Sequence, residues 1–576
     1  MILGSVRRDQ HGSGTDRIGT LPGRGHGPFL PLSFALPEGP WVGSPLEPVR
    51  PSTPVLLILA VLGSVLPGGA ADPPGAVLPN PEDRLAVARG SQLARTYCTT
   101  CHLFPEPDAV DRATWFEQIL PRMKYRLGFT TAELDRSADI QTLRQHHRIP
   151  LEPVVTEAQW LDLCSYYLAN APEKPLPQTA PLPIGLGVPG FESAILPIRS
   201  PQPAVTALRI LPEGGALMAD DFGKSLQWVG PDGRVAGGVA LGASIGSLRP
   251  VGGAMLTSGL GSFMPTDARG GSVFWLRPTN GWSASPPVLS GLPRTTDANE
   301  ADLNGDGRPD LVVSCFGNNL GRLSWWESMA DGTHREHELL PIPGTLRTEI
   351  ADFDRDGRLD IAALVAQETE ALFLFKGDGR GGFTRSTVFQ RPPYWGHSHF
   401  TVADFNRDGH PDFLVTNGDN GEFSSPAKRV HGVRLYASQP GGEWKEAFFL
   451  PLYGAYHSVV RDFDRDGDLD IATISFFPEY QKAPRGSFVF FRNEGADRFT
   501  ASTFRESATG RWVSMDAGDF DHDGAEDILL GSYIKGPTPV PTALLDGWQK
   551  TGRPLLLLRN TTPAGGQQPV APSKSP

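Results

Sequence analysis

The segment DFDRDGRLD at residues 352–360 runs directly into the apolar stretch IAALVA at 361–366. Four further segments share this pattern: DLNGDGRPD at 302, DFNRDGHPD at 404, DFDRDGDLD at 462 and DFDHDGAED at 519. Oxygen-bearing side chains at loop positions 1, 3, 5 and 9 can surround a hard cation, and Gly at position 6 permits the sharp turn that this requires. The five segments therefore predict up to five calcium loops.

Two kinds of loop compete for this pattern, an EF-hand between helices and a hairpin between strands. An EF-hand needs a bidentate Glu at position 12. Those positions hold other residue types, namely Val313, Ala363, Val415, Thr473 and Leu530. The apolar runs that follow the loops read as short buried strands, which favours the hairpin. Solvated turns without metal are a weaker explanation, because the pattern repeats its carboxylates with no counter-charge of its own.

A second repeat predicts the number of structural units. Seven apolar segments recur along residues 190–560 at a spacing near that of the acidic loops. They are SLQWV (225–229), SVFWL (272–276), RLSWW (322–326), ALFLF (371–375), VRLYA (433–437), SFVFF (487–491) and LLLLR (555–559). A long repeat with several short strands per unit is typical of a β-propeller, and Gly 66 with Pro 55 suits such a turn-rich β fold. We therefore expect seven blades, of which the first two lack the acidic loop.

The ends of the array predict how the ring closes. Most blades continue past the apolar segment into an outer strand, but the seventh stops at LLLLRN before a tail rich in Pro and Gly. The segment GFESAILPI at 190–198, ahead of the first blade, has the missing pattern. We expect it to cross over and complete blade seven, which would remove an exposed sheet edge.

A different chemistry is predicted nearer the amino terminus, in the segment YCTTCH at 97–102. The spacing of Cys98, Cys101 and His102 allows two thiols to add to the vinyl groups of a haem while the imidazole ligates the iron. A zinc site would need a second pair of ligands, and the next cysteine, Cys164, stands alone. A thioredoxin-like pair would need a surrounding βαβ pattern, which is missing here. The motif therefore predicts one covalent haem c.

The second axial ligand of the iron is approached by elimination. Met123 is the only methionine between His102 and Met218, and Pro121 just before it is expected to break a helix, which would leave Met123 in a loop crossing the haem face. Ligation by His146 or His147 and a five-coordinate iron are the alternatives. A Met ligand would raise the reduction potential, as suits electron transfer.

Residues 82–172 resemble a small all-α monohaem class I cytochrome c, on the motif at 97–102 and the helical segment WLDLCSYYLANAP at 160–172. Residues 190–560 resemble the FG-GAP or VCBS repeats of integrin-like seven-bladed propellers, on the five acidic segments. The whole chain looks like a bacterial fusion of the two. The resemblance implies that the calcium ligands are Asp302, Asn304, Asp306, Asp310, Asp352, Asp354, Asp356, Asp360, Asp404, Asn406, Asp408, Asp412, Asp462, Asp464, Asp466, Asp470, Asp519, Asp521, Asp523 and Asp527.

The remaining segments predict an exported protein. Residues 55–71 contain a 12-residue apolar run, too short to span a bilayer, followed by small residues near Ala71; this pattern indicates a signal peptide and its cleavage site. Residues 1–54 are irregular and are interpreted as an extension upstream of the true translation start. We expect a Pro-rich linker at 173–189, a disordered tail at 561–576, and no transmembrane segment in the mature chain, located in the periplasm or outside the cell.

The strand before each acidic loop is expected to be the innermost of its blade and to line a central channel. Its channel-facing residues would lie five and three positions before the loop. They are Asp297, Arg347, His399, His457 and Ser514 in the first set and Asn299, Glu349, Thr401, Val459 and Asp516 in the second. Such residues are explained either by a water-filled channel or by a ligand site, and no catalytic residue follows from them.

Charge and motifs narrow the function. The net charge of -12 speaks against nucleic-acid partners, which need clustered Lys and Arg. The sequence predicts an exported one-electron carrier whose propeller binds a redox partner protein, a small-molecule electron donor or a substrate. The alternatives are a haem-coupled dehydrogenase with its active site in the propeller channel, and an adhesion protein in which the haem is secondary.

Overall fold

The computed structural model describes residues 78–421 and 427–562. The chain divides into residues 1–76 and 77–576, and every described residue belongs to the second part. The predicted N-terminal extension at 1–54 and the signal peptide at 55–71 lie outside the described residues, as does nearly all of the tail at 561–576. Among the described residues, no helix is long and apolar enough to cross a membrane.

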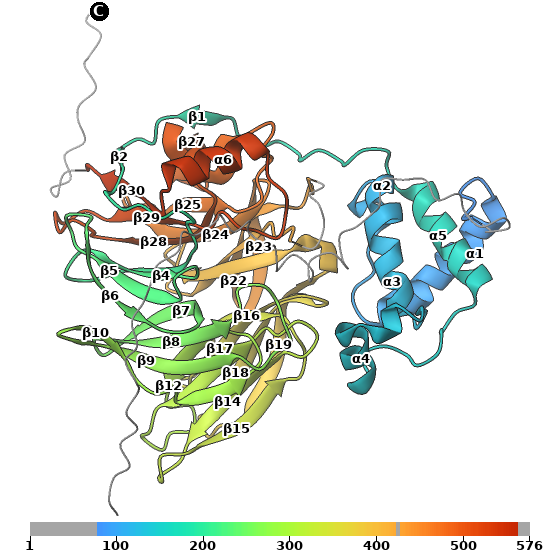
Figure 1. The fold of residues 1–576 in the computed structure, drawn as a ribbon, viewed down its shortest axis with the longest axis horizontal. Coiled ribbons are helices and arrows are strands. Elements are labelled where there is room, and N and C mark those ends of the chain that lie inside the picture. The colour runs from blue at the N-terminus through green and yellow to red at the C-terminus, as the bar shows by residue number, and fades with distance from the viewer. Residues whose placement is uncertain (1–77, 422–426, 563–576) are drawn as a thin grey trace, which may run out of the picture. The chain divides into compact units, whose positions relative to one another are not determined.

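Residues 78–172 form a group of helices (Figure 1). The α-helices are α1 (Arg84–Tyr97), α2 (Arg112–Thr114), α3 (Leu120–Arg126), α4 (Ala138–Gln145) and α5 (Glu157–Asn170). Short turns η1 (Cys98–Thr100), η2 (Pro107–Ala109) and η4 (Leu134–Arg136) connect them, and a π-helical turn, η3 (Trp115–Ile119), links α2 to α3. The expected helix around Trp160 is confirmed as α5.

Helices α1 and α5 begin at well-formed N-caps and pack closely together. The Asp83 carboxylate accepts the backbone N–H groups of Leu85 and Ala86, and a capping box starts α5. The two helices approach so closely at Gly90 that a Cβ there would lie 1.9 Å from the carbonyl oxygen of Asp162. Glycine is therefore required at this crossing, which brings the end of α1 against the core of the helical group.

One sequence expectation in this region is wrong. Met123 does not lie in a loop but in α3, after Pro121 in the first turn of that helix. Pro121 follows directly on the π-helical turn η3, where the regular α-helical hydrogen bonding is already interrupted, so its missing N–H is accommodated there. The helix break expected from Pro121 therefore does not occur.

The rest of the chain is an all-β propeller of seven sheets. In the first four blades the strands are β3 (Val205–Ile210), β4 (Ala216–Asp220), β5 (Ser225–Val229), β6 (Val235–Ala240); β7 (Ser244–Val251), β8 (Ala254–Gly261), β9 (Gly271–Thr279), β10 (Gly281–Ala284), β11 (Leu289–Leu292); β12 (Thr295–Ala301), β13 (Asp310–Cys315), β14 (Arg322–Ser328), β15 (His334–Leu340); β16 (Thr345–Ala351), β17 (Asp360–Ala366), β18 (Glu370–Gly377) and β19 (Phe383–Arg391). Both β10 and β11 pair with β9.

Blades five to seven complete the ring. Their strands are β20 (His397–Ala403), β21 (Asp412–Asn417), β22 (Gly432–Gln439), β23 (Glu443–Pro451); β24 (Ala455–Arg461), β25 (Asp470–Ser475), β26 (Phe488–Asn493), β27 (Phe499–Thr503); β28 (Trp512–Gly518), β29 (Asp527–Ser532), β30 (Leu555–Asn560) and β2 (Phe191–Ala194). Turns η5 (Pro393–Trp395), η6 (Pro484–Ser487) and η7 (Arg505–Thr509) and helix α6 (Thr542–Thr551) lie between strands. The seven apolar segments of the sequence are the third strands.

The predicted ring closure is confirmed. Strand β2 pairs antiparallel with β30, with Phe191 opposite Asn560 and Ala194 opposite Leu557. Figure 1 shows the teal strand β2 beside the red β30. The Phe191 ring packs against Phe463 and Phe490, at centroid distances of 5.6 and 5.5 Å. The first segment of the propeller thus enters the core between blades six and seven.

The segment at 173–189 is not only a linker. Within it, β1 (Ile184–Leu186) pairs in parallel with β27 and adds a fifth strand to blade six. Its three residues are exposed. Because the pairing uses backbone groups alone, the Pro-rich composition around β1 does not reveal it.

A β-bulge recurs at the same place in all seven innermost strands. In each, the pairing with the second strand skips one residue near its start, as between Thr295 and Asp297 in β12. The same irregularity occurs in the six other first strands. A bulge bends and twists its strand, and here it sets which side chains of the first strand turn toward the centre of the ring.

Replacing Phe191 with Ala is expected to lower the free energy of unfolding by about 2 kcal/mol, because a half-buried aromatic contact is lost at the ring closure. Chemical denaturation of the full chain measures this. The matched control is Glu192→Ala, since Glu192 lies on the same strand and is exposed. If the two variants are equally stable, the aromatic side chain of Phe191 contributes nothing to the stability of the closure.

Candidate functional site

The five acidic loops join the first and second strands of blades three to seven. Each begins just after the innermost strand and ends at the first residue of the next, as between β16 and β17. The same arrangement holds for the other four. The prediction of hairpin loops is confirmed.

The loop backbone is left-handed at two positions. Gly at position 6 has a positive φ in every loop, for example 85° at Gly357. Position 4 also has a positive φ where it is not glycine, at Arg355, Arg407, Arg465 and His522. A left-handed conformation is costly for such residues and persists at sites where the surroundings require it.

The aspartate at position 9 ties each loop to the third strand of its blade. The Asp360 carboxylate accepts N–H groups from Phe353, in the loop, and from Gly377, at the end of β18, at 3.0 and 2.9 Å. Asp310, Asp412 and Asp527 accept the equivalent pairs of N–H groups, and Asp470 accepts the one from the third strand. All five side chains are fully buried. These aspartates therefore hold the hairpin together whether or not an ion is bound.

The interpretation that the acidic loops have no counter-charge is wrong, because basic side chains pair with their carboxylates. Within the loops, Arg308 and Arg358 pair with the position-5 carboxylates Asp306 and Asp356. Lys376, Arg492 and Arg559, all at the end of third strands, pair with the position-3 carboxylates Asp354, Asp464 and Asp521 at 3.2, 2.6 and 2.5 Å. In the loops that carry Asn304 and Asn406 at position 3, the corresponding third-strand residues are Glu327 and Ala437. The charge at position 3 thus matches the strand beside it.

Three of the five loops fit a divalent cation by their geometry. Three carboxylates each bring one oxygen to within 4.8 Å of the others in Asp352/Asp354/Asp356, Asp462/Asp464/Asp466 and Asp519/Asp521/Asp527. In the same loops, buried carboxylate oxygens of Asp354, Asp462, Asp470 and Asp521 have no hydrogen-bond partner. Burial raises the pKa of Asp470 to about 7 and that of Asp527 to about 6. Unpartnered carboxylate oxygens that face one another are suitable ligands for Ca²⁺.

The predicted channel lining is brought together as expected. The innermost strands of neighbouring blades contact one another in a closed circle, from β3 through β7, β12, β16, β20 and β24 to β28 and back to β3. Counting from the conserved place of the bulge, the first ring of channel positions holds Ala207, Ser247, Asp297, Arg347, His399, His457 and Ser514. The second ring holds Arg209, Arg249, Asn299, Glu349, Thr401, Val459 and Asp516.

A chain of ion pairs runs around part of this channel. Arg249 of blade two contacts Asp297 of blade three through two hydrogen bonds, at 3.0 and 2.7 Å, and reaches Glu349 of blade four at 2.8 Å. Glu349 also accepts a hydrogen bond from Arg347 at 2.6 Å. Burial alone would raise the pKa of Asp297, but the adjacent Arg249 lowers it below the ordinary value. Three blades are thus linked by charge as well as by packing.

Two imidazoles occupy the next part of the channel wall. The rings of His399 and His457 are 3.9 Å apart between centroids. Burial lowers the pKa of His457 to about 3, helped by Arg347 and Arg209. Burial and the neighbouring His457 lower the pKa of His399 well below its usual range. Both rings are therefore neutral near pH 7.

Sequence reasoning missed the arginines of blades one and two. Arg209 and Arg249 lie two residues beyond the bulge, at the same position as Asn299. The acidic loop that locates the channel residues in later blades is absent from these two blades. Only the bulge register, which is a property of the backbone, places both arginines in the channel.

The predicted thiols and imidazole lie at the end of α1. Cys98 is half-buried and receives a hydrogen bond from the Tyr167 hydroxyl at 3.8 Å, while Cys101 is exposed. The Nδ1 of His102 lies 2.8 Å from the carbonyl oxygen of Leu103. Because a carbonyl only accepts, Nδ1 carries the proton and Nε2 keeps its lone pair. Burial lowers the pKa of His102, which keeps the ring neutral.

The candidates for a second axial ligand differ in their surroundings. Met123 is half-buried and packs, together with Cys98, on the hydrophobic core that α1 and α5 share. His146 and His147 are exposed near the end of α4. The buried residues of α4 belong to a separate cluster. Of the three, Met123 is the one that shares a cluster with Cys98.

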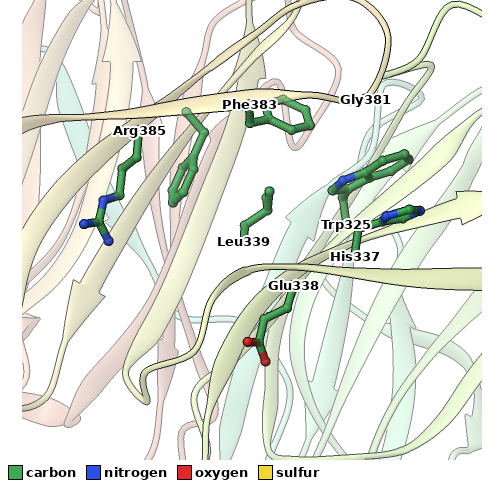
Figure 2. Close-up of a pocket in the computed structure, with 8 residues that line it drawn as sticks. Trp325, His337, Glu338, Leu339, Gly381, Phe383 and Arg385 are labelled. Carbon is green, nitrogen blue, oxygen red and sulfur yellow. The ribbon is translucent and has the colours of Figure 1, made fainter.

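A pocket of about 520 Å³ lies on the outer strands of blades three and four. Figure 2 shows Trp325 and His337 lying one beside the other on one side of it. Their rings are stacked at 4.3 Å, and a Cβ at Gly381 would lie 2.8 Å from the Trp325 ring. Trp325 is only 4% exposed, and His337 pairs with Glu327. The aromatic rings therefore serve the packing between blades.

Replacing Asp297 with Ala is expected to lower the free energy of unfolding by about 3–5 kcal/mol, because Arg249 would keep a buried charge with one partner removed. Chemical denaturation measures the change. Asp232→Ala is the control, since that carboxylate is 64% exposed and its ion pair with Arg234 is long, at 3.7 Å. A loss under 1 kcal/mol for Asp297→Ala would contradict the role assigned to this ion pair.

Comparisons with known proteins give a family match for part of the propeller. A search of curated proteins found no match. Among solved structures, virginiamycin B lyase from Staphylococcus aureus is 10% identical, with a TM-score of 0.41, covering 64% of this chain and 98% of that one. A streptogramin B lyase structure is 12% identical, with a TM-score of 0.40 and coverage of 64% and 97%. Residues 302–363, 352–415 and 462–530 match the family of FG-GAP-like repeats. Three stretches of this seven-bladed propeller, within blades three to seven, are therefore FG-GAP-like repeats.

Proposed function

We propose that this chain is an exported c-type haem protein that transfers single electrons, and that its calcium-stabilised propeller binds a redox partner or a substrate. The observation that carries the proposal is the prepared state of His102, whose Nδ1 faces the Leu103 carbonyl while Nε2 is left for a metal. Ligating histidines are commonly oriented by a backbone carbonyl in this way. Haem, when bound, supplies a one-electron couple.

The neighbouring residues support the same interpretation. Cys98 and Cys101 would hold the haem through two thioethers, starting from the turn η1 that directly follows α1. Met123 is the proposed second ligand, because it packs on the same cluster as Cys98. The partly buried apolar side chains on this cluster would exclude water from one face of the haem. They are Leu93, Tyr97, Phe104, Leu127 and Phe129. As part of this proposal, residues 82–172 form a domain of the class I cytochrome c type.

Calcium is proposed to stabilise the propeller rather than to take part in electron transfer. The loops at 352, 462 and 519 support it through their grouped carboxylates and unpartnered oxygens. The loops at 302 and 404 have a neutral Asn at position 3, so we propose weaker binding there. Export is consistent with both parts, because haem c is attached outside the cytoplasm and calcium is abundant there.

A covalent haem is expected to survive denaturation. The full chain, produced with a haem-attachment system, should give a haem-stained band on a denaturing gel, and the double variant Cys98→Ala/Cys101→Ala should not, since two thioethers are lost. Cys164→Ala is the matched control, because Cys164 is a buried thiol on α5 of the same domain. An unstained wild-type chain would refute the haem proposal.

Removing calcium is expected to lower the melting temperature of the propeller. An ion that binds only the folded state adds about 2.7 kcal/mol per site at a concentration of 100 times Kd. Thermal melting with excess Ca²⁺ and with a chelator measures the difference.

The variant Asp464→Asn should reduce this calcium-dependent difference, since it removes one carboxylate of the triad at 462. Asp546→Asn is the control, because Asp546 is exposed on α6, away from the acidic loops in sequence. Identical melting with calcium and with chelator would refute calcium binding and leave the haem proposal untouched.

A further inference from the structure

The channel wall formed by blades four to six contains polar atoms that have no hydrogen-bond partner. They are Nε of Arg347 and both ring nitrogens of His399. The ring of His457 lies beside that of His399. A buried polar group without a partner costs about 1–3 kcal/mol. A group that accepts hydrogen bonds from Nε of Arg347 and from the one N–H of the neutral His399 ring would offset part of this cost.

The carboxylates of the channel are already engaged elsewhere. Asp297 accepts hydrogen bonds from Arg249, from the Asn299 amide and from the backbone N–H of Thr348. Asp516 accepts the backbone N–H of Ile210 at 2.7 Å and lies 3.4 Å from Arg209. The carboxylate oxygens of Asp297 and Asp516 thus accept from donors other than Nε of Arg347 and the His399 ring.

Glu349 does not fill the gap either. Its Oε1 accepts from Arg249 and from Nη2 of Arg347, which leaves Nε of the same guanidinium without an acceptor. Arg347 therefore has part of its hydrogen-bonding capacity directed at something other than Glu349. The three arginines and three carboxylates of the channel balance in number, but their hydrogen bonds do not balance at this wall.

The electrostatics favour an anion over a metal ion at this place. Burial is the main cause that lowers the pKa of His399 and of His457, and the positive charges of Arg347 and Arg249 at His399, and of Arg347 and Arg209 at His457, add to it. The same charges would repel a cation placed at the imidazoles. A neutral imidazole offers one N–H donor and a guanidinium offers a charged fork, a combination suited to oxygen atoms that carry negative charge.

The wall is partly open at its arginine. The side chain of Arg347 is 26% exposed and that of Glu349 is 25% exposed, whereas Nε of Arg347 and the ring nitrogens of His399 are buried behind them, so an anion would approach from the exposed part of the Arg347 guanidinium. Burial nonetheless lowers the pKa of Arg347, as expected for a narrow channel surrounded by protein. Charged hydrogen bonds are stronger in such surroundings than at an open surface.

We propose that Arg347, His399 and His457 form a binding site for a small oxyanion, a phosphate or a carboxylate group, inside the propeller channel. Arg347 supplies the positive charge and a free N–H, and the imidazoles supply neutral donors. The site depends on neither the haem nor the calcium loops. It gives the channel a ligand chemistry, which the channel-lining pattern alone does not specify.

Titration calorimetry of the calcium-loaded full chain with inorganic phosphate, and separately with acetate, at constant ionic strength tests the site. We expect saturable binding of at least one anion, and Arg347→Gln should weaken it by about tenfold or more, the range for a charged hydrogen bond. Arg380→Gln removes the same charge from an exposed position and should change the affinity by less than twofold. The anion that binds with the higher affinity shows whether the site prefers a phosphate or a carboxylate group.

A second variant and a second measurement guard against a folding defect. His457→Gln leaves the Arg249 ion pairs in place and should weaken binding severalfold while the melting temperature is kept. Selenate soaked into crystals should give an anomalous peak beside Arg347 and His399. Absence of saturable binding for both anions in the millimolar range would overturn the proposal, as would equal effects of Arg347→Gln and Arg380→Gln. In either case the unpartnered atoms would hold water.

Discussion

The propeller depends on the pairing of four residues at its beginning with four at its end. Strand β2 joins β30 through backbone hydrogen bonds, and this connects segments at the two ends of the propeller sequence. Without it, blade seven would expose an unpaired edge at β30. The side chain of Phe191 anchors the same strand in the core between blades six and seven.

The carboxylates of the acidic loops perform two separate tasks. The position-9 aspartates bind backbone N–H groups and define the hairpins, so they are structural in every one of the five loops. The carboxylates at position 1 accept backbone N–H groups of the loop, and those at position 3 pair with basic residues of the third strand in three loops. In three loops, three of the carboxylates also bring one oxygen each close to the others. One short motif thus contains both the clamp of a hairpin and the ligands proposed for an ion.

In the channel, the same backbone irregularity recurs in every blade and determines which side chains come together. The same bulge in all seven first strands turns residues from seven blades toward one axis. Arg249 then spans three blades, and His399 comes to lie against His457 although 58 residues of sequence spacing separate their loops. Each blade thus contributes its own side chain to a shared ring of residues around the channel axis.

Local sequence patterns were sufficient to predict much of the fold of this protein. The acidic loops, the apolar third strands and the segment at 190–198 determine the number of blades and the closure, because hydrogen bonding and alternation along a strand are short-range properties. The sequence alone also placed Cys98, Cys101 and His102 together, since they are adjacent in the chain. Tertiary structure decided what depends on distant partners: the helical setting of Met123, the pairing of β1 with β27, the basic partners of the loops and the place of Arg209 and Arg249 in the channel. Those features follow from how separate segments pack, and no neighbouring residue encodes them.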